Sequence, residues 1–475
     1  MITEQEILTY DIASISALIK EKKISPAEIA LQLLERIDTV DSVINSFITV
    51  NREDVLEQAK QAEQEIEAGE YKGPLHGIPI GLKDLIYTKN LKTTMGSEIF
   101  KDYLPEYNAT VVDKLKEAGA IIIGKLNTHQ FAYGPTGDRS YFGPVRNPHD
   151  IKKMTGGSSS GSAAAVSACL CYGSLGTDTG GSVRIPASFC GVVGMKPTYG
   201  RISNHGVFPL SSTLDHVGPL TRTVKDNALL LNALVDYASM DLNLTQNGQE
   251  DFLRDIGKGI ESMKIGVPAS FYFEDMNADV REVMDETIEV LKHMGAIVSD
   301  IYLPNIKNFS EAYKVILSSE AYAVHEQNLS DFPDKWDDEV KERLLTALDT
   351  KGFEYVQALQ TRQFAKEEFN QVLEEVDIIL TPTLPILPPN INERHVDIEK
   401  YAGQHIRWSI IKLTSPTNLN GFPSISVPCG FSADGLPVGI QFIGKEYDEA
   451  TLYRVGYALE TELALDTAKY DIAVR

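Results

Sequence analysis

The segment best suited to chemistry runs from Met154 to Tyr199 and is rich in glycine and serine. Its serines include Ser158 and Ser182, and a serine hydroxyl becomes a nucleophile when a base stands beside it. The segment departs from three common glycine motifs. No Gly-Lys-Ser/Thr follows its glycines as in a phosphate loop, no Gly-x-Gly-x-x-Gly is present, and Arg184 breaks the Gly-x-Ser-x-Gly elbow of esterases. A flexible linker is disfavoured because the stretch after Ser162 is too apolar for a solvated tether.

The residues around Ser182 could form an oxyanion hole. Because glycine has no side chain, successive backbone N–H groups can converge on one point. The amides expected to do so belong to Thr179, Gly180, Gly181 and Ser182. Such amides stabilise the negative charge that develops on a carbonyl oxygen during acyl transfer.

The candidate base is Lys83, since none of the nine histidines lies in a comparable motif. Lys83 follows an apolar run flanked by Gly77 and Gly81, which reads as a buried strand. Burial disfavours the charged ammonium, and a lysine pKa lowered to ~7–8 would suit a general base. A Ser–Lys hydrolase is therefore one interpretation of the residues themselves.

Helices and short strands must position these groups. Ser25, followed by Pro26 and by Glu28, predicts a helix start, and a second helix is expected from about Glu53 to Ala68. Further along, β-branched runs alternate with helical stretches, which predicts an α/β layered fold with a mostly parallel or mixed central sheet covered by helices on both faces. The expected strands are Ile78–Leu82, Ala120–Ile123, Ile265–Val267, Ala296–Val298, Val376–Leu380, Ile425–Val427 and Val438–Ile443. Three stretches read as polar or irregular connections: Asp241–Glu261, His325–Gly352 and Leu384–Gln404.

Composition limits the class of protein. The chain has 475 residues, of which 43% are hydrophobic, and its formal net charge is -23. A surface this acidic repels phosphate backbones, so no direct nucleic-acid contact is expected. No apolar run is long enough for a membrane span and no signal peptide is visible. The four cysteines are too few for a disulfide framework and form no metal motif. A cytoplasmic enzyme without metal or cofactor is the expectation.

Together these motifs resemble the amidase signature family. The resemblance covers most of the chain, and the blocks that carry it are Gly77–Leu85, Gly124–Gly134, Gly156–Val166, Gly176–Tyr199, Ser211–Val224, Asn418–Pro423 and Pro437–Gly444. The resemblance implies a catalytic triad with Ser182 as the acyl-forming nucleophile, Ser158 as the bridging serine and Lys83 as the base. It also implies a cis peptide bond between Gly157 and Ser158.

The same resemblance places Ala132 and Tyr133 in the strip that lines the acyl pocket. Asp178 and Arg184 are interpreted differently, as an ion pair that braces the nucleophile turn rather than as reacting groups. The whole chain, 1–475, is expected to be a single amidase signature domain. Its parts are an N-terminal helical region (1–70), the catalytic signature core (71–235) and a remainder (262–475) that completes the sheet and supplies substrate-pocket loops.

Two functional hypotheses of different class remain. The first, which the sequence favours, is a stand-alone amidase that hydrolyses a carboxylic, non-peptide amide to an acid and ammonia or an amine. The second is the glutaminase component, or A subunit, of a tRNA-dependent amidotransferase, which the first half also resembles. In that component an aspartate contacts the glutamine amino group, but here Ile411 stands at the position expected for that aspartate. The component also has a segment that contains arginine and tyrosine, and Ser318–His325 lacks the pattern of that segment. Arg343 is a loose match for the carboxylate-binding arginine of the same component.

A third hypothesis is a specialised hydrolase of ureas, carbamates, cyclic amides or aryl amides. All three hypotheses require a small-molecule amide substrate and no membrane. Dimers are common among relatives in this family, so a homodimer is the simplest assembly that the resemblance implies.

Overall fold

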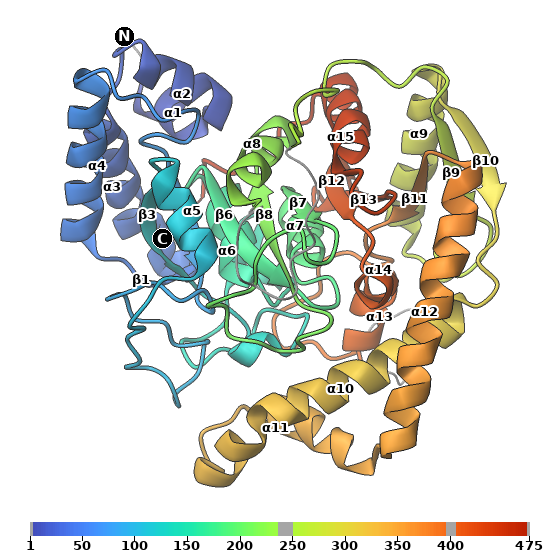
Figure 1. Ribbon diagram of the computed structural model, residues 1–475. Helices are drawn as coiled ribbons and strands as arrows, with labels where there is room; N and C mark the ends of the chain where they lie inside the picture. The colour runs from blue at the N-terminus through green and yellow to red at the C-terminus, as the bar shows by residue number, and fades with distance from the viewer. Residues whose placement is uncertain (1–2, 236–249, 396–404, 473–475) are drawn as a thin grey trace.

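The computed structural model describes residues 3–235, 250–395 and 405–472 (Figure 1). Its helices are α1 (Glu4–Thr9), α2 (Ile12–Lys20), α3 (Pro26–Ile44), α4 (Arg52–Glu67), α5 (Thr110–Glu117), α6 (Ser160–Ser167), α7 (Arg184–Cys190), α8 (Val224–Leu234), α9 (Ala278–His293), α10 (Ile306–Asp331), α11 (Asp338–Leu345), α12 (Gly352–Glu375), α13 (Arg407–Ile411), α14 (Ser415–Asn420) and α15 (Glu449–Leu463), with short 3-10 turns at Gln130–Ala132 and Thr346–Asp349.

The strands are β1 (Phe47–Thr49), β2 (Pro79–Lys83), β3 (Ile121–Leu126), β4 (Arg146–Asn147), β5 (Asp150–Met154), β6 (Gly173–Asp178), β7 (Val193–Lys196), β8 (His216–Thr221), β9 (Lys264–Pro268), β10 (Ile297–Ile301), β11 (Ile378–Pro382), β12 (Ser424–Phe431) and β13 (Pro437–Ile443). Eleven of them form one sheet in the order β1-β3-β2-β6-β8-β7-β12-β13-β11-β9-β10, while β4 and β5 form a separate hairpin. Strands from both halves of the chain therefore share one sheet.

The sheet is mixed, as the sequence predicts. The pairs β2–β3, β2–β6, β9–β10 and β9–β11 are parallel, and the remaining pairs are antiparallel. The helices that pack on it include α4, α5, α6, α7, α8, α9 and α15; among them α6 packs against α7, and α8 packs against α5 and α15. Each of the seven predicted strands lies in the sheet, shifted by at most three residues at its start.

The helical predictions for the N-terminal region are also confirmed. Ser25 caps α3 by accepting a hydrogen bond from the Glu28 N–H, and Pro26 occupies the first helical position. Helix α4 begins at Arg52 and has Val55, Ala59, Ala62 and Ile66 on its buried side.

One prediction is wrong. The stretch His325–Gly352 is mostly helical, because it holds the end of α10, all of α11 and the first residue of α12. Its many charges conceal a short amphipathic helix whose buried side carries Val340, Arg343 and Leu344. The first part of the predicted polar connection Asp241–Glu261 (241–249) and the end of Leu384–Gln404 (396–404) lie outside the described residues, and residues 250–261 form turns and irregular structure, as predicted.

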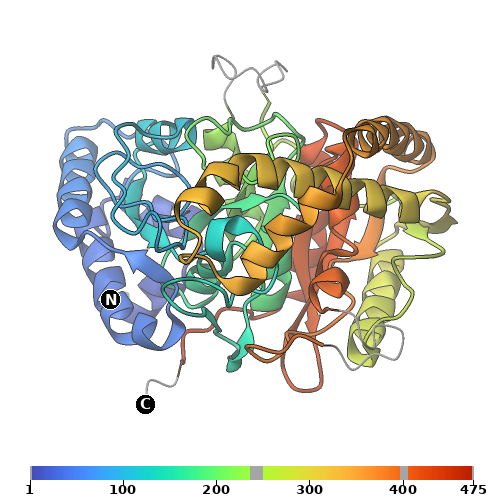
Figure 2. The same ribbon diagram turned by 90° about the horizontal axis from the view of Figure 1, so that it is seen from below.

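Helices α10, α11 and α12 form an arm across one end of the sheet (Figures 1 and 2). Helix α10 packs against α11, α12 and α14. Within the described ranges, no helix has both the length and the apolar character required to cross a membrane.

Candidate active site

Lys83 and Ser158 meet at one end of the neighbouring strands β2 and β6. Lys83 is the last residue of β2, which runs parallel to β6, so its side chain lies beside Thr177 near the same end of the neighbouring strand. Its Nζ donates to the Ser158 Oγ at 2.7 Å and to the Thr177 Oγ1 at 2.7 Å. All three side chains are buried.

The environment of Lys83 favours the neutral amine. Burial lowers the pKa of Lys83 to about 7, while the carboxylates of Asp215 and Asp178 oppose this shift. A lysine with this pKa is partly deprotonated near neutral pH, which a general base requires. Thr177 and Asp215 lie in the blocks Gly176–Tyr199 and Ser211–Val224, but the sequence analysis assigned neither residue a role.

Ser182 lies next to this pair, at the turn between β6 and α7. The Ser159 N–H donates to the Ser182 carbonyl at 3.3 Å, which joins the two serine-bearing turns. The Gly157–Ser158 peptide bond is cis, as predicted. The turn itself requires glycine, because Gly181 has φ +125° and a Cβ at Gly180 would lie 1.9 Å from the Tyr313 hydroxyl.

One of the four amides expected in the oxyanion hole is already engaged. The Gly181 N–H donates to the Asp178 Oδ1 at 2.8 Å. In this arrangement Gly181 is therefore not free to bind a carbonyl oxygen, which corrects the sequence prediction. Thr179, Gly180 and Ser182 instead line a neighbouring cavity.

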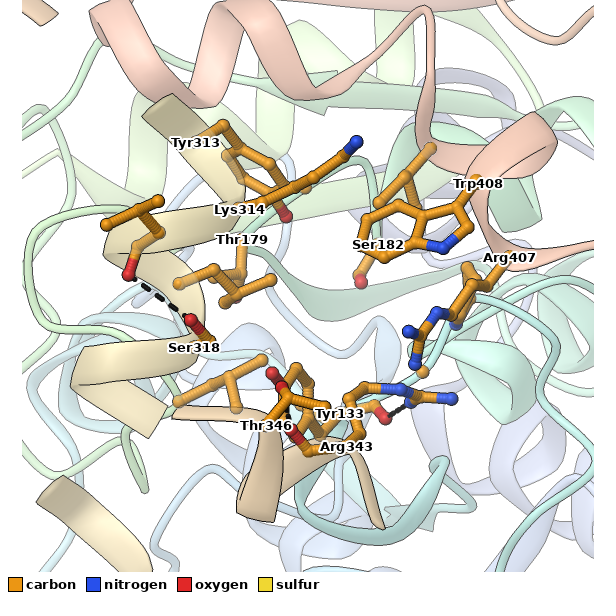
Figure 3. Close-up of a pocket in the computed structure, with 18 residues that line it drawn as sticks. Tyr133, Thr179, Ser182, Tyr313, Lys314, Ser318, Arg343, Thr346, Arg407 and Trp408 are labelled. Atoms are coloured by element: carbon orange, nitrogen blue, oxygen red, sulfur yellow. Dashed lines mark hydrogen bonds between the residues drawn. The ribbon is translucent and has the colours of Figure 1, made fainter. Parts of the chain in front are cut away.

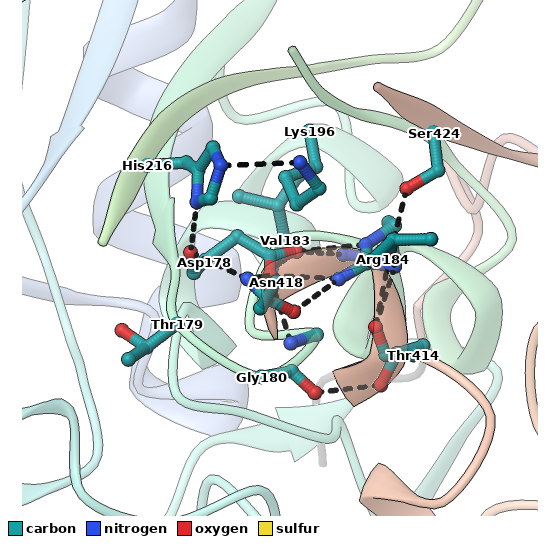
Figure 4. A network of polar contacts seen from close by, with 12 residues as sticks. Asp178, Thr179, Gly180, Val183, Arg184, Lys196, His216, Thr414, Asn418 and Ser424 are labelled. Atoms are coloured by element: carbon teal, nitrogen blue, oxygen red, sulfur yellow. Dashed lines mark hydrogen bonds and ion pairs between the residues drawn. The ribbon is translucent and has the colours of Figure 1, made fainter. Parts of the chain in front are cut away.

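A polar network holds the turn that carries Ser182 in place (Figure 4). Arg184 pairs with Asp178 at 2.9 Å, and both side chains are fully buried, which confirms the predicted ion pair. Asn418 donates to the Asp178 Oδ1 at 2.8 Å, and the Arg184 guanidinium also donates to Gln441 at 2.6 Å. Burial alone would raise the pKa of the Asp178 carboxyl, but the charge and hydrogen bonds of Arg184 hold it well below its ordinary value.

We expect Asp178→Asn to destabilise the fold by about 3–5 kcal/mol, because it leaves the Arg184 charge buried without a counter-charge. The free energy of unfolding from chemical denaturation measures this effect. Glu289→Gln is the matched control, since Glu289 pairs with Lys292 on the surface and should change stability by less than about 0.5 kcal/mol. A loss below about 1 kcal/mol for Asp178→Asn would show that the network does not brace the turn.

The cavity beside Ser182 has a volume of about 260 Å³ (Figure 3). The signature core contributes Thr179, Gly180 and Ser182 to its wall, together with the predicted substrate contacts Ala132 and Tyr133. Helices α10, α11 and α13 supply most of the remaining wall: Tyr313, Lys314, Val315, Leu317, Ser318, Arg343, Arg407, Trp408 and Ile411. Arg343 and Ile411, singled out in the sequence, thus both lie in the wall of the cavity that Ser182 lines.

Comparisons with known proteins assign the family. A family model described as Amidase matches residues 28–453. The A subunit of the glutamyl-tRNA(Gln) amidotransferase of Geobacter sp. (strain M21) is 41% identical, over 96% of this chain and 98% of that protein. The chain therefore belongs to the amidase signature family, and it is an amidohydrolase of that family.

Solved structures agree in fold with this assignment. The A subunit of the glutamyl-tRNA(Gln) amidotransferase of Thermotoga maritima is 34% identical with a TM-score of 0.83, covering 99% of this chain and 98% of that one. The native peptide amidase of Stenotrophomonas maltophilia is 28% identical with a TM-score of 0.85, covering 98% and 99%. The relatives in sequence support the amidotransferase hypothesis more strongly than the stand-alone hypothesis that the sequence analysis preferred.

Proposed function

We propose that this chain hydrolyses a carboxylic amide through an acyl-enzyme on Ser182. The observation that carries the proposal is the buried Lys83 amine, hydrogen-bonded to Ser158 beside a cavity that Ser182 lines. Neutral Lys83 takes the proton of Ser158, and Ser158 takes the proton of Ser182 as the Ser182 Oγ attacks the amide carbon. The carbon–nitrogen bond then breaks, and the proton returns through Ser158 to the leaving nitrogen.

Water completes the cycle by attacking the acyl-enzyme through the same proton relay. In both halves of the reaction the negative oxygen is stabilised by the backbone N–H groups of Thr179, Gly180 and Ser182. Each such donor contributes about 3–4 kcal/mol to the transition state. Ala132 and Tyr133, which also line the cavity, contact the acyl group.

Two roles are compatible with this chemistry. The relatives favour the glutaminase component of a tRNA-dependent amidotransferase, which releases ammonia for a partner. The position of Arg343 in the cavity wall supports this role, because its guanidinium group can pair with the α-carboxylate of glutamine. Ile411 supports the stand-alone role, because an apolar side chain stands in the cavity wall where the aspartate of the glutaminase component is expected.

Ammonia release by the purified chain distinguishes the two roles. The substrates are glutamine, aliphatic amides and aryl anilides, each assayed alone and then with the partner proteins of the amidotransferase and charged tRNA. Turnover of a simple amide by the chain alone would establish the stand-alone role. Glutamine cleavage that depends on the added partners would establish the amidotransferase role, and no release under either condition would contradict the proposed hydrolysis.

A further inference from the structure

The cavity beside Ser182 is positively charged. Its charged wall residues are Lys314, Arg343 and Arg407, and none of the wall residues in the described part of the chain is an aspartate or glutamate. Lys314 is paired with Glu311 at 2.6 Å, so Arg343 and Arg407 supply most of the positive charge of the wall, in a protein whose net charge is -23. Such a cavity attracts anions and repels cationic ligands.

Two of these cations, Arg343 and Arg407, lie close together in the wall. Figure 3 shows the guanidinium groups of Arg343 and Arg407 near each other in the cavity wall. Burial lowers the pKa of Arg343 to about 10, and the charge of Arg407 contributes to this shift, so both groups remain charged near neutral pH. Glu339 and Asp337, which do not line the cavity, oppose the lowering of the Arg343 pKa, and Glu339 opposes that of Arg407. An anion inside the cavity would further offset the repulsion between the two guanidinium groups.

Both arginines also keep unused hydrogen-bonding capacity. Arg343 is only 8% exposed and donates one N–H to the Tyr133 carbonyl, but its buried Nε has no partner. The buried Nε of Arg407 likewise has no partner. Two guanidinium groups with free N–H donors suit the two oxygens of a carboxylate.

The part of the wall around Trp408 offers little to an ammonium group. Trp408 lies between Lys314 and Arg407, whose charged groups stand 4.5 Å from its ring centroid. Ile411 adds an apolar side chain to the same wall. An ammonium group would therefore meet three cations and lose its hydration without a matching carboxylate.

We propose that the cavity selects amides whose acyl part ends in a carboxylate and carries no amino group, that is, monoamides of short dicarboxylic acids. Arg343 and Arg407 hold the carboxylate, and Arg407 is the specificity-determining residue. The inference rests on the proposed function, because Ser182 attacks the amide at the other end of this acyl chain. Water replaces the amide nitrogen, so the products are the dicarboxylic acid and ammonia.

Three five-carbon amides of matched length test the proposal: glutaric acid monoamide, pentanamide and L-glutamine. Their binding to Ser182→Ala is measured by calorimetry, which needs no turnover. The monoamide is expected to bind at least about tenfold more tightly than either other amide, since it alone offers the two guanidinium groups a carboxylate without bringing an ammonium group into the cavity. Equal affinity for pentanamide, tighter binding of glutamine, or no binding of the monoamide would overturn the inference.

Arg407→Gln, introduced into Ser182→Ala, should weaken binding of the monoamide about 10- to 100-fold. Arg52→Gln is the matched control, because Arg52 lies on the surface in a pair with Asp38, and it should leave the affinity within twofold. An affinity unaffected by Arg407→Gln would overturn the role of Arg407. The binding test is independent of the proposed function: turnover of pentanamide or glutamine without selective binding would refute only the inference, and selective binding without turnover in the wild type would refute only the hydrolysis.

Discussion

Replacing Ser182 by alanine is expected to lower kcat for every amide substrate by about 10⁴-fold or more, without changing the fold. The hydroxyl is the only group of the protein that forms a bond to the substrate carbon in the proposed reaction. Its loss therefore removes the covalent path and leaves only the binding of the substrate and the oxyanion amides. Ammonia release under saturating substrate measures the effect, and mass spectrometry of the quenched wild-type reaction should detect the acyl group on Ser182.

Ser167→Ala provides a matched control for this result. Ser167 is the last residue of α6, and its buried hydroxyl makes no hydrogen bond, so its removal leaves no partner unsatisfied. We expect full activity for Ser167→Ala and the same thermal midpoint for both variants. Turnover by Ser182→Ala at a rate close to that of the wild type would show that another group is the nucleophile.

The fold could be predicted where strands are rich in β-branched residues. Runs such as Ala120–Ile123 and Val438–Ile443 stand out from their polar surroundings, and they lie in strands β3 and β13 of the sheet. The central strands β6, β7 and β8 escaped prediction. Strand β6 has the sequence GSLGTD, which shows neither alternation nor an apolar run, although all of its residues are buried. Its strand geometry comes from pairing with β2 and β8, a property of the assembled sheet that local sequence does not encode.

The candidate site, too, could be predicted only where its residues lie in local motifs. Lys83, Ser158 and Ser182 lie in motifs with recognisable local patterns, and the structure brings them to one end of β2 and β6. The part of the cavity wall that α10, α11 and α13 supply could not be predicted from the sequence, because its residues Tyr313, Arg343 and Arg407 come from three separate helices. Only the packing of α10 against α11 and α14 places those helices around the cavity.

Gly181 shows why a motif does not fix the role of each backbone group. The sequence correctly marks the turn after β6 as glycine-rich, and Gly181 adopts a positive φ there. The use of its N–H, however, depends on the Asp178 carboxylate, which Arg184 and Asn418 orient from the far side of the turn. The amide that braces the turn and the amides that face the cavity can be distinguished only in three dimensions.

Replacing Lys83 by methionine should lower kcat/KM by about 10²–10⁴-fold and change its dependence on pH. In the wild type only the neutral amine accepts a proton. Since burial holds the pKa of Lys83 at about 7, kcat/KM should rise about tenfold per pH unit below pH 7 and level off above it. Lys83→Met lacks this titration, so its remaining activity should continue to rise with pH as hydroxide replaces the missing base.

Initial rates between about pH 5 and pH 10, with substrate well below KM, separate a base from a structural lysine. Lys92→Met serves as the control, because Lys92 is exposed and pairs with Asp102 on the surface, and its profile should match the wild type. A structural role for Lys83 predicts a lower rate with an unchanged pH profile. A base predicts that the inflection near pH 7 disappears with the amine, because the proton relay through Ser158 begins at that nitrogen.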